Sequence, residues 1–175
     1  GSFFRGSAAA EIDFKNEGVK KMKISFSTLG CPGFDWPDIY SMAKDFGFSG
    51  IELRGLGGDI FSVHARPFRE ENLEKTVEQL RALRLEICCL SSGCALRYAE
   101  KAEETYHELL EYIDLAEKLS TPYIRILADR FADVHGEVDD EKIEAALRRL
   151  APHAEKAGVT LLVETNGVYA DTKRL

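Results

Sequence analysis

Residues 156–167, KAGVTLLVETNG, place a helix end, an apolar strand and a polar strand end in direct succession. Gly158 follows a run with apolar residues at helical spacing, and glycine there is typical of a helix end. The run Val159–Val163 is apolar or β-branched, which is typical of a strand buried between two layers. Glu164 and Asn166 then follow at its carboxyl end. The stretch predicts a helix–strand unit of an α/β protein with polar chemistry at the strand end.

The same alternation of strand and helix runs through the chain from residue 23 onward. Apolar, β-rich runs predict strands, and apolar residues at helical spacing predict helices. The predicted strands are 23–29, 50–53, 85–91, 123–127 and 159–163, and the predicted helices are 36–46, 70–84, 99–119 and 139–157. This order predicts a parallel sheet covered by helices.

Five βα units at this spacing favour a (β/α)₈ TIM-barrel type fold that is incomplete, because a full barrel needs about 250 residues. A helix is expected to begin near the last residue, Leu175. The competing interpretation is an open, doubly wound sheet of five strands. Such a sheet often carries a glycine-rich phosphate turn after its first strand, and none follows residues 23–29.

Residues 1–21 do not match this pattern. Gly1-Ser2 is typical of a protease-cleavage scar, and residues 6–10 (GSAAA) have the composition of a linker. We therefore expect residues 1–21 to be a tag- or linker-like extension and residues 22–175 to form the folded domain.

The composition excludes several partners. A net charge of −7 argues against nucleic acid, whose phosphates require an excess of lysine and arginine. No apolar run is long enough for a membrane span or a signal core, which predicts a cytoplasmic protein. The four cysteines (Cys31, Cys88, Cys89 and Cys94) contain no CxxC pair. Free thiols in a reducing compartment are the favoured interpretation, with a thiolate metal site or disulfides as alternatives.

Polar residues at or near the predicted strand ends are the candidate site. Glu52 and Arg54 share one side of their strand, where they would position a substrate or form an internal salt bridge. Arg125 lies within an apolar strand, where it requires an anionic partner, either a substrate group or a neighbouring acid. Glu164 is either a site carboxylate or a solvated side chain, and Asn166 can hydrogen-bond a hydroxyl.

The ordered segments GIELRG (50–55), CLSSGC (89–94) and LLVETNGVYADTKRL (161–175) resemble the sugar-phosphate isomerase/epimerase family. That family belongs to the xylose isomerase-like TIM barrel superfamily, and the resemblance covers residues 23–175. It implies a divalent metal (Mn²⁺, Mg²⁺, Co²⁺ or Zn²⁺) at the barrel mouth, with Glu164 as the ligand from the fifth strand. The family's other ligands come from strands six to eight, so the resemblance leaves a tight metal site in doubt here. Asn166 stands where the family often has histidine.

The resemblance implies proton transfer beside the carbonyl of a small sugar or sugar phosphate, with Glu164 as metal ligand and possible base and with weak or no activity from five strands alone. One alternative is a polyol dehydratase, of the inosose type, on the same scaffold. An abasic-site endonuclease is disfavoured by the acidic charge and by missing ligands, and His64 is a weak candidate ligand. The non-enzymatic alternative is a part-barrel that forms homo-oligomers through its exposed sheet edges.

Overall fold

The computed structural model describes residues 22–131, 134 and 136–174. The predicted extension, residues 1–21, lies outside the described residues, so its nature stays a prediction. The strands are β1 (Ser25–Ser27), β2 (Gly50–Leu53), β3 (Glu86–Ala95), β4 (Tyr123–Leu127) and β5 (Thr160–Glu164). The helices are α1 (Trp36–Asp45), α2 (Glu70–Leu83), α3 (Ala102–Leu119) and α4 (Asp140–Lys156).

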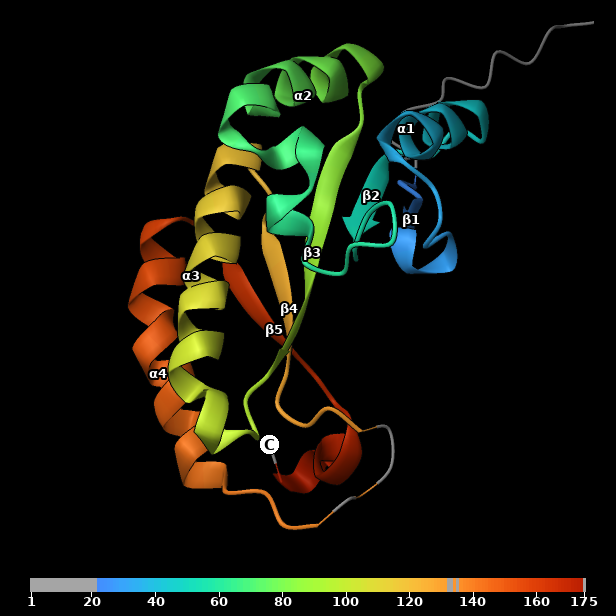
Figure 1. The fold of residues 1–175 in the computed structure, drawn as a ribbon. Coiled ribbons are helices and arrows are strands. Elements are labelled where there is room, and N and C mark those ends of the chain that lie inside the picture. Colours follow the sequence, from blue (N-terminus) through green and yellow to red (C-terminus); the bar gives the residue numbers. More distant parts are fainter. Residues whose placement is uncertain (1–21, 132–133, 135, 175) are drawn as a thin grey trace, which may run out of the picture.

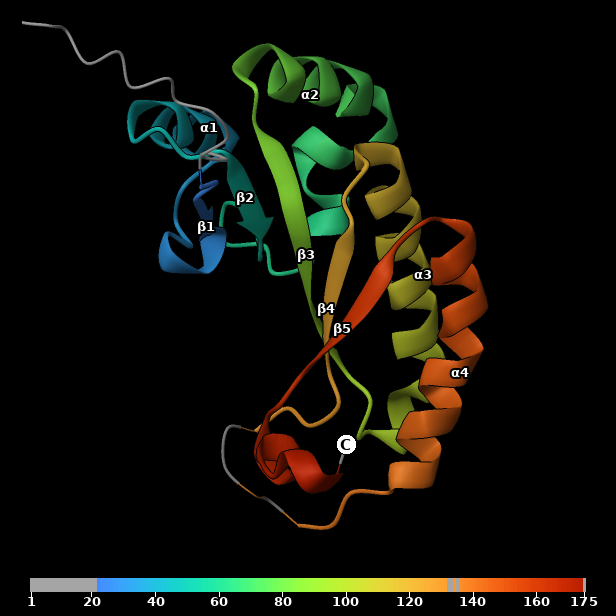
Figure 2. The ribbon, with the colours of Figure 1, turned by 180° about the vertical axis from the view of Figure 1, so that it is seen from behind.

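The strands form one sheet in the order β1-β2-β3-β4-β5, and every neighbouring pair is parallel. The predicted part-barrel is therefore confirmed: five parallel strands follow one another as in a barrel wall. In Figures 1 and 2, α3 and α4 lie side by side on one face of β3–β5, and no described helix covers the opposite face. We call this opposite face the inner face.

Alternation along each strand divides apolar from polar residues between the two faces. Ile51 and Leu53 on β2, and Ile124 and Ile126 on β4, are completely buried in the core under the helices. The residues between them turn to the inner face. The rule that builds the core thus also supplies the inner face with its side chains.

Local sequence explains where the helices begin and end. The Asp35 side chain accepts a hydrogen bond from the Asp38 backbone N–H, and the Asp38 side chain accepts one from the Asp35 backbone N–H, which makes a capping box at the start of α1. Asp139 caps α4 by accepting from the Lys142 N–H. α2 ends at Arg84, which adopts the left-handed conformation.

One strand differs from the sequence-based expectation. β3 continues to Ala95, past the predicted end at residue 91, because Ala95 still pairs with Leu127 beyond an irregularity in register. Two short 3₁₀ turns, Gly167–Ala170 and Thr172–Arg174, follow β5, and Leu175, near which a helix is expected to begin, lies outside the described residues. None of the described helices combines the length and apolar character needed to cross a bilayer.

Candidate functional site

Glu164 is the last residue of β5 and lies on the inner face. In the register of β4 and β5, Arg125 is opposite Leu162 and Leu127 is opposite Glu164, so Arg125 and Glu164 share that face. The Arg125 Nε donates to a Glu164 carboxylate oxygen, which makes an ion pair between neighbouring strands. The Glu164 side chain remains 41% exposed and that of Arg125 is 20% exposed. The carboxylate is therefore held in place and still open to solvent.

Arg125 is fixed from the other side by β3. Its Nη1 donates to the Ser92 carbonyl at 2.8 Å, and the buried Ser92 hydroxyl donates back to the Arg125 carbonyl at 2.9 Å. The guanidinium thus connects β3, β4 and β5. The neighbouring acid that the sequence requires for Arg125 is Glu164.

Glu52 and Arg54 both lie at the end of β2 but do not meet each other. Glu52 accepts a hydrogen bond from the Ser27 hydroxyl at 3.3 Å. Arg54 donates from Nη1 to the Ile60 carbonyl at 3.4 Å and lies over Gly93, where an added Cβ would be 3.6 Å from its Nη2. Within the described residues no ion pair joins Glu52 to Arg54, so the internal salt bridge considered from the sequence does not form.

Cys89 lies beside Glu52 in the strand register. Burial, and secondarily the charge of Glu52, raises the pKa of the Cys89 thiol to about 11. The thiol is therefore protonated at neutral pH and is a poor nucleophile. All four cysteines are free, which agrees with the absence of a CxxC pair.

Asn166 lies in the loop that follows β5. Its backbone N–H donates to the Glu164 carbonyl at 2.9 Å, and its carbonyl accepts from the Tyr169 N–H at 3.0 Å. The half-buried side chain follows Glu164 by two residues. Glu164, Arg125 and Asn166 are thus brought to one end of the sheet, whereas Glu52 and Arg54 lie two strands away on β2.

An ion pair missed from the sequence supports this loop. Asp129, completely buried after β4, accepts from Arg97 Nη1 at 2.5 Å and from the Val168 N–H at 3.4 Å. Burial alone would raise the pKa of Asp129, but Arg97 and two backbone N–H groups hold it below its usual value. A carboxylate two residues after the apolar strand YIRIL, at 123–127, is the one sequence signal for Asp129.

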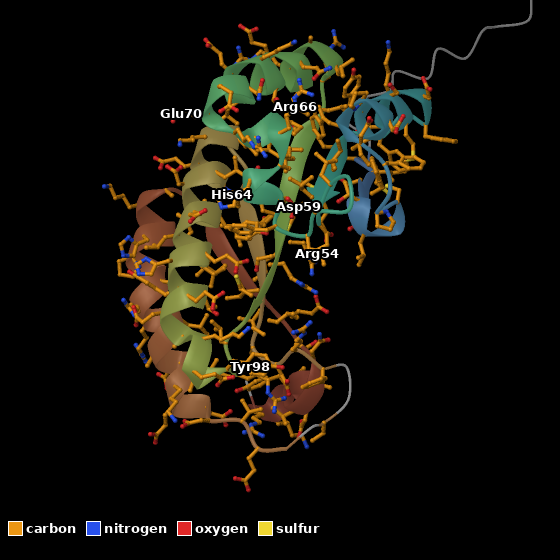
Figure 3. All side chains as sticks on the ribbon, viewed as in Figure 1. Arg54, Asp59, His64, Arg66, Glu70 and Tyr98 are labelled. Carbon is orange, nitrogen blue, oxygen red and sulfur yellow. The ribbon has the colours of Figure 1, made fainter. Side chains whose placement is uncertain are left out.

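His64 is directed away from the inner face. Its Nε2 is 3.2 Å from a carboxylate oxygen of Glu111 on α3, and its ring contacts Phe61 edge-on. Figure 3 shows His64 on the side of α3, while Arg54 lies near the end of β2. Nothing in this arrangement supports a ligand role for His64.

A divalent metal does not fit the described residues by themselves. In residues 22–131, 134 and 136–174, no group of three or more His, Cys, Asp or Glu side chains is close enough to hold an ion. Glu164 offers one carboxylate, and Arg125 already contacts it. Because divalent ions need several oxygen or nitrogen ligands, we assign no metal-dependent step to this chain.

Comparison with known proteins now identifies the class to which this part-barrel belongs. The model of the xylose isomerase-like TIM barrel family matches residues 40–171. The chain is a member of that family. A search of curated protein sequences finds no match.

Solved structures share the fold at low identity. The probable 3-DHS dehydratase AsbF from Bacillus anthracis is 22% identical with a TM-score of 0.63, over 85% of this chain and 54% of that one. The IolI protein, solved with a bound zinc atom, is 17% identical with a TM-score of 0.61, over 81% of this chain and 51% of that one. A xylose isomerase-like TIM barrel protein from Mycobacterium smegmatis, in complex with magnesium, is 17% identical with a TM-score of 0.62, over 82% and 55%. The chain thus spans about half the length of these structures.

Proposed function

We propose that this chain forms the N-terminal part of an isomerase or epimerase of a small sugar or sugar phosphate, with Glu164 as the group that moves a proton beside the carbonyl. The observation that carries the proposal is the pair of Arg125 and Glu164 on the inner face, at the carboxyl end of β5. In barrels of this type, functional groups lie at the carboxyl ends of the strands. The free cysteines support a reducing, cytoplasmic location.

The chemistry requires a fixed carboxylate with an accessible oxygen. Arg125 orients Glu164, while the exposed part of the carboxylate faces solvent. The carboxylate removes a proton from the carbon next to a carbonyl and returns it to the same or the neighbouring carbon. Arg54 and Asn166 supply donors for hydroxyl or phosphate oxygens, and Glu52 supplies an acceptor.

Deuterium exchange tests this proposal. The protein is incubated in D₂O with D-fructose or D-fructose 6-phosphate, and incorporation beside the carbonyl is followed by NMR, with and without Mn²⁺. We expect Glu164→Gln to lower the exchange rate by about 100-fold, whereas Glu117→Gln, at an exposed position of α3, leaves it unchanged. Exchange by Glu164→Gln at the unaltered rate would refute the role of Glu164.

A separate experiment tests whether this chain alone binds a divalent metal. Because the described residues offer one carboxylate, calorimetric titration of Mn²⁺ into this chain should show only weak binding. Sub-micromolar affinity would contradict our ligand assignment. A polyol dehydratase on the same scaffold would also use Glu164 to remove a proton, but its product would lose water, which the NMR experiment distinguishes from isomerisation.

Self-association is the second candidate, and the sheet edges favour it. Among the described residues, β1 pairs with β2 alone and β5 with β4 alone, and parallel edges left open in this way can pair with another chain. Tyr123 and Leu162 on the inner face are 43% and 40% exposed. A two-fold axis along the barrel would set β5 of one copy beside β1 of the next. Light scattering that gives a monomer mass at micromolar concentration would refute this candidate.

A further inference from the structure

Two cavities adjoin beneath the first turns of α3, outside the inner face. Each has a volume of about 330 Å³, and the two share Ala95, Tyr98 and Thr105 as walls. One lies between α3 and α4, and the other lies between α3 and the end of β3. Tyr98, labelled in Figure 3, lies at the lower end of α3, where the strands end. Their volumes reach the range of small-molecule sites.

The cavity between α3 and α4 is apolar because alanines line it. Ala99 lines it from the turn before α3, Ala102 from the first residue of α3, and Ala145 and Ala146 from α4. The cations at its rim already have acidic partners: Lys142 Nζ is 2.9 Å from Asp139, and Arg149 binds both oxygens of Glu103. The cavity therefore suits an uncharged apolar group better than an anion.

The cavity beside β3 is polar and carries both signs of charge. Glu104 and Glu108 line it from α3, and Arg130 lines it from the loop after β4. Gly93, Glu100 and Lys101 also line it. None of Glu104, Glu108 and Arg130 has an ion-pair partner among residues 22–131, 134 and 136–174. Donors and acceptors in one cavity suit hydroxyl groups, which both donate and accept.

Thr105 lines both cavities and offers a hydroxyl to a ligand in either one. It is only 8% exposed, and it lines both spaces. Within the described part of the chain, its hydroxyl makes no hydrogen bond. The hydroxyl is not one of the fully enclosed polar atoms, so it is open to the cavities, where a ligand hydroxyl can hydrogen-bond to it.

We propose that these adjoining cavities bind a small neutral ligand composed of a hydroxylated ring and an apolar substituent. The hydroxylated ring lies against Tyr98 and hydrogen-bonds to Thr105, Glu104 and Glu108. The substituent occupies the alanine-lined cavity. This site uses neither Glu164 nor Arg125, so a test of ligand binding here is independent of the isomerase proposal.

Calorimetry with p-nitrophenyl β-D-glucopyranoside tests the site. We expect binding with a dissociation constant at or below about 1 mM, and at least tenfold weaker binding of both methyl β-D-glucopyranoside and p-nitrophenol, because each fills one cavity only. Equal affinity for the methyl and p-nitrophenyl glucosides would overturn the role of the apolar cavity. The absence of heat and of NMR shift changes at 10-fold higher glucoside concentration would overturn the whole site.

Variants locate the binding. Ala146→Leu fills the apolar cavity and should weaken binding of the p-nitrophenyl glucoside at least tenfold, whereas Ala151→Leu, exposed on α4 outside the cavity, should not. Glu104→Gln, at an exposed wall of the polar cavity, should weaken it severalfold, with Glu117→Gln as its control. Thermal melts establish that each variant folds. Unchanged affinity in both Ala146→Leu and Glu104→Gln would place the ligand elsewhere and refute the proposal.

Discussion

Replacing Asp129 with asparagine should lower the free energy of unfolding by about 3 kcal/mol, because it removes the buried charge that Arg97 contacts. The Asp129 side chain is 0% exposed and that of Arg97 is 12% exposed, with 2.5 Å between Oδ1 and Nη1. Removing one partner of a buried pair costs about 3–5 kcal/mol, and the residual exposure of Arg97 places the effect at the lower end. In a chain of this length, about 3 kcal/mol lowers the melting temperature by about 6–12 °C.

The stabilisation by Asp129 should also depend on pH in a defined direction. The folded pKa of Asp129 lies below its unfolded value of about 3.9, so the unfolded state takes up a proton first as the pH falls. The stabilisation is fully present above about pH 4 and is lost as the pH falls through the folded pKa. Asp129→Asn cannot titrate, so the stability difference between the two proteins should shrink on acidification.

Urea unfolding, followed by circular dichroism between pH 7 and pH 3, measures both effects. Asp45→Asn is the control, because Asp45 is exposed at the end of α1 and should change stability by well under 1 kcal/mol. The double variant Arg97→Met/Asp129→Leu should recover part of the loss, since replacing both charges leaves neither buried without its partner. If Asp129→Asn unfolds at the same urea concentration as Asp45→Asn, the buried pair does not stabilise this part of the fold.

Two further predictions concern the same end of the sheet and the cysteines. Gly167 and Gly158 both have positive φ. A Cβ added at Gly167 would lie 2.2 Å from Asp129 Oδ2, whereas a Cβ added at Gly158 would have no atom within 4 Å among the described residues. Gly167→Ala should therefore destabilise by at least about 2 kcal/mol more than Gly158→Ala in the same urea assay. Burial raises the pKa of both Cys94 and Cys31, but Cys94 is buried and Cys31 is partly exposed, so iodoacetamide at pH 8 should modify Cys31 first in intact-mass measurements.

The regular elements could be predicted because their signals are local. Residues 123–127 were predicted as a strand and form β4, and residues 70–84 were predicted as a helix and differ from α2 by one residue. The end of β3 was missed because SGCA, at 92–95, has no β-rich pattern. Its strand conformation depends on pairing with Leu127, a contact that the local sequence does not reveal.

The site could be predicted only in part, for a related reason. Alternation predicts which residues of one strand share a face, so Glu164 at a strand end and Arg125 within a strand were recognised. Their ion pair depends on the register between β4 and β5, which a single strand does not contain. The contact between Arg97 and Asp129 joins two loops, and loops carry no periodic signal from which to predict it.

The inner face is polar because side chains along a strand alternate between the two faces of the sheet, and the apolar ones face the helices. On β4, Ile124 and Ile126 lie under the helices, so Arg125 between them must turn the other way. An arginine there would be costly against an apolar wall, and it becomes favourable because β5 ends in Glu164 on the same face. Each charge therefore makes the other tolerable at this position. Any group that takes Glu164 as a ligand must compete with Arg125 or leave that guanidinium in need of another anion, which a substrate phosphate or carboxylate would supply.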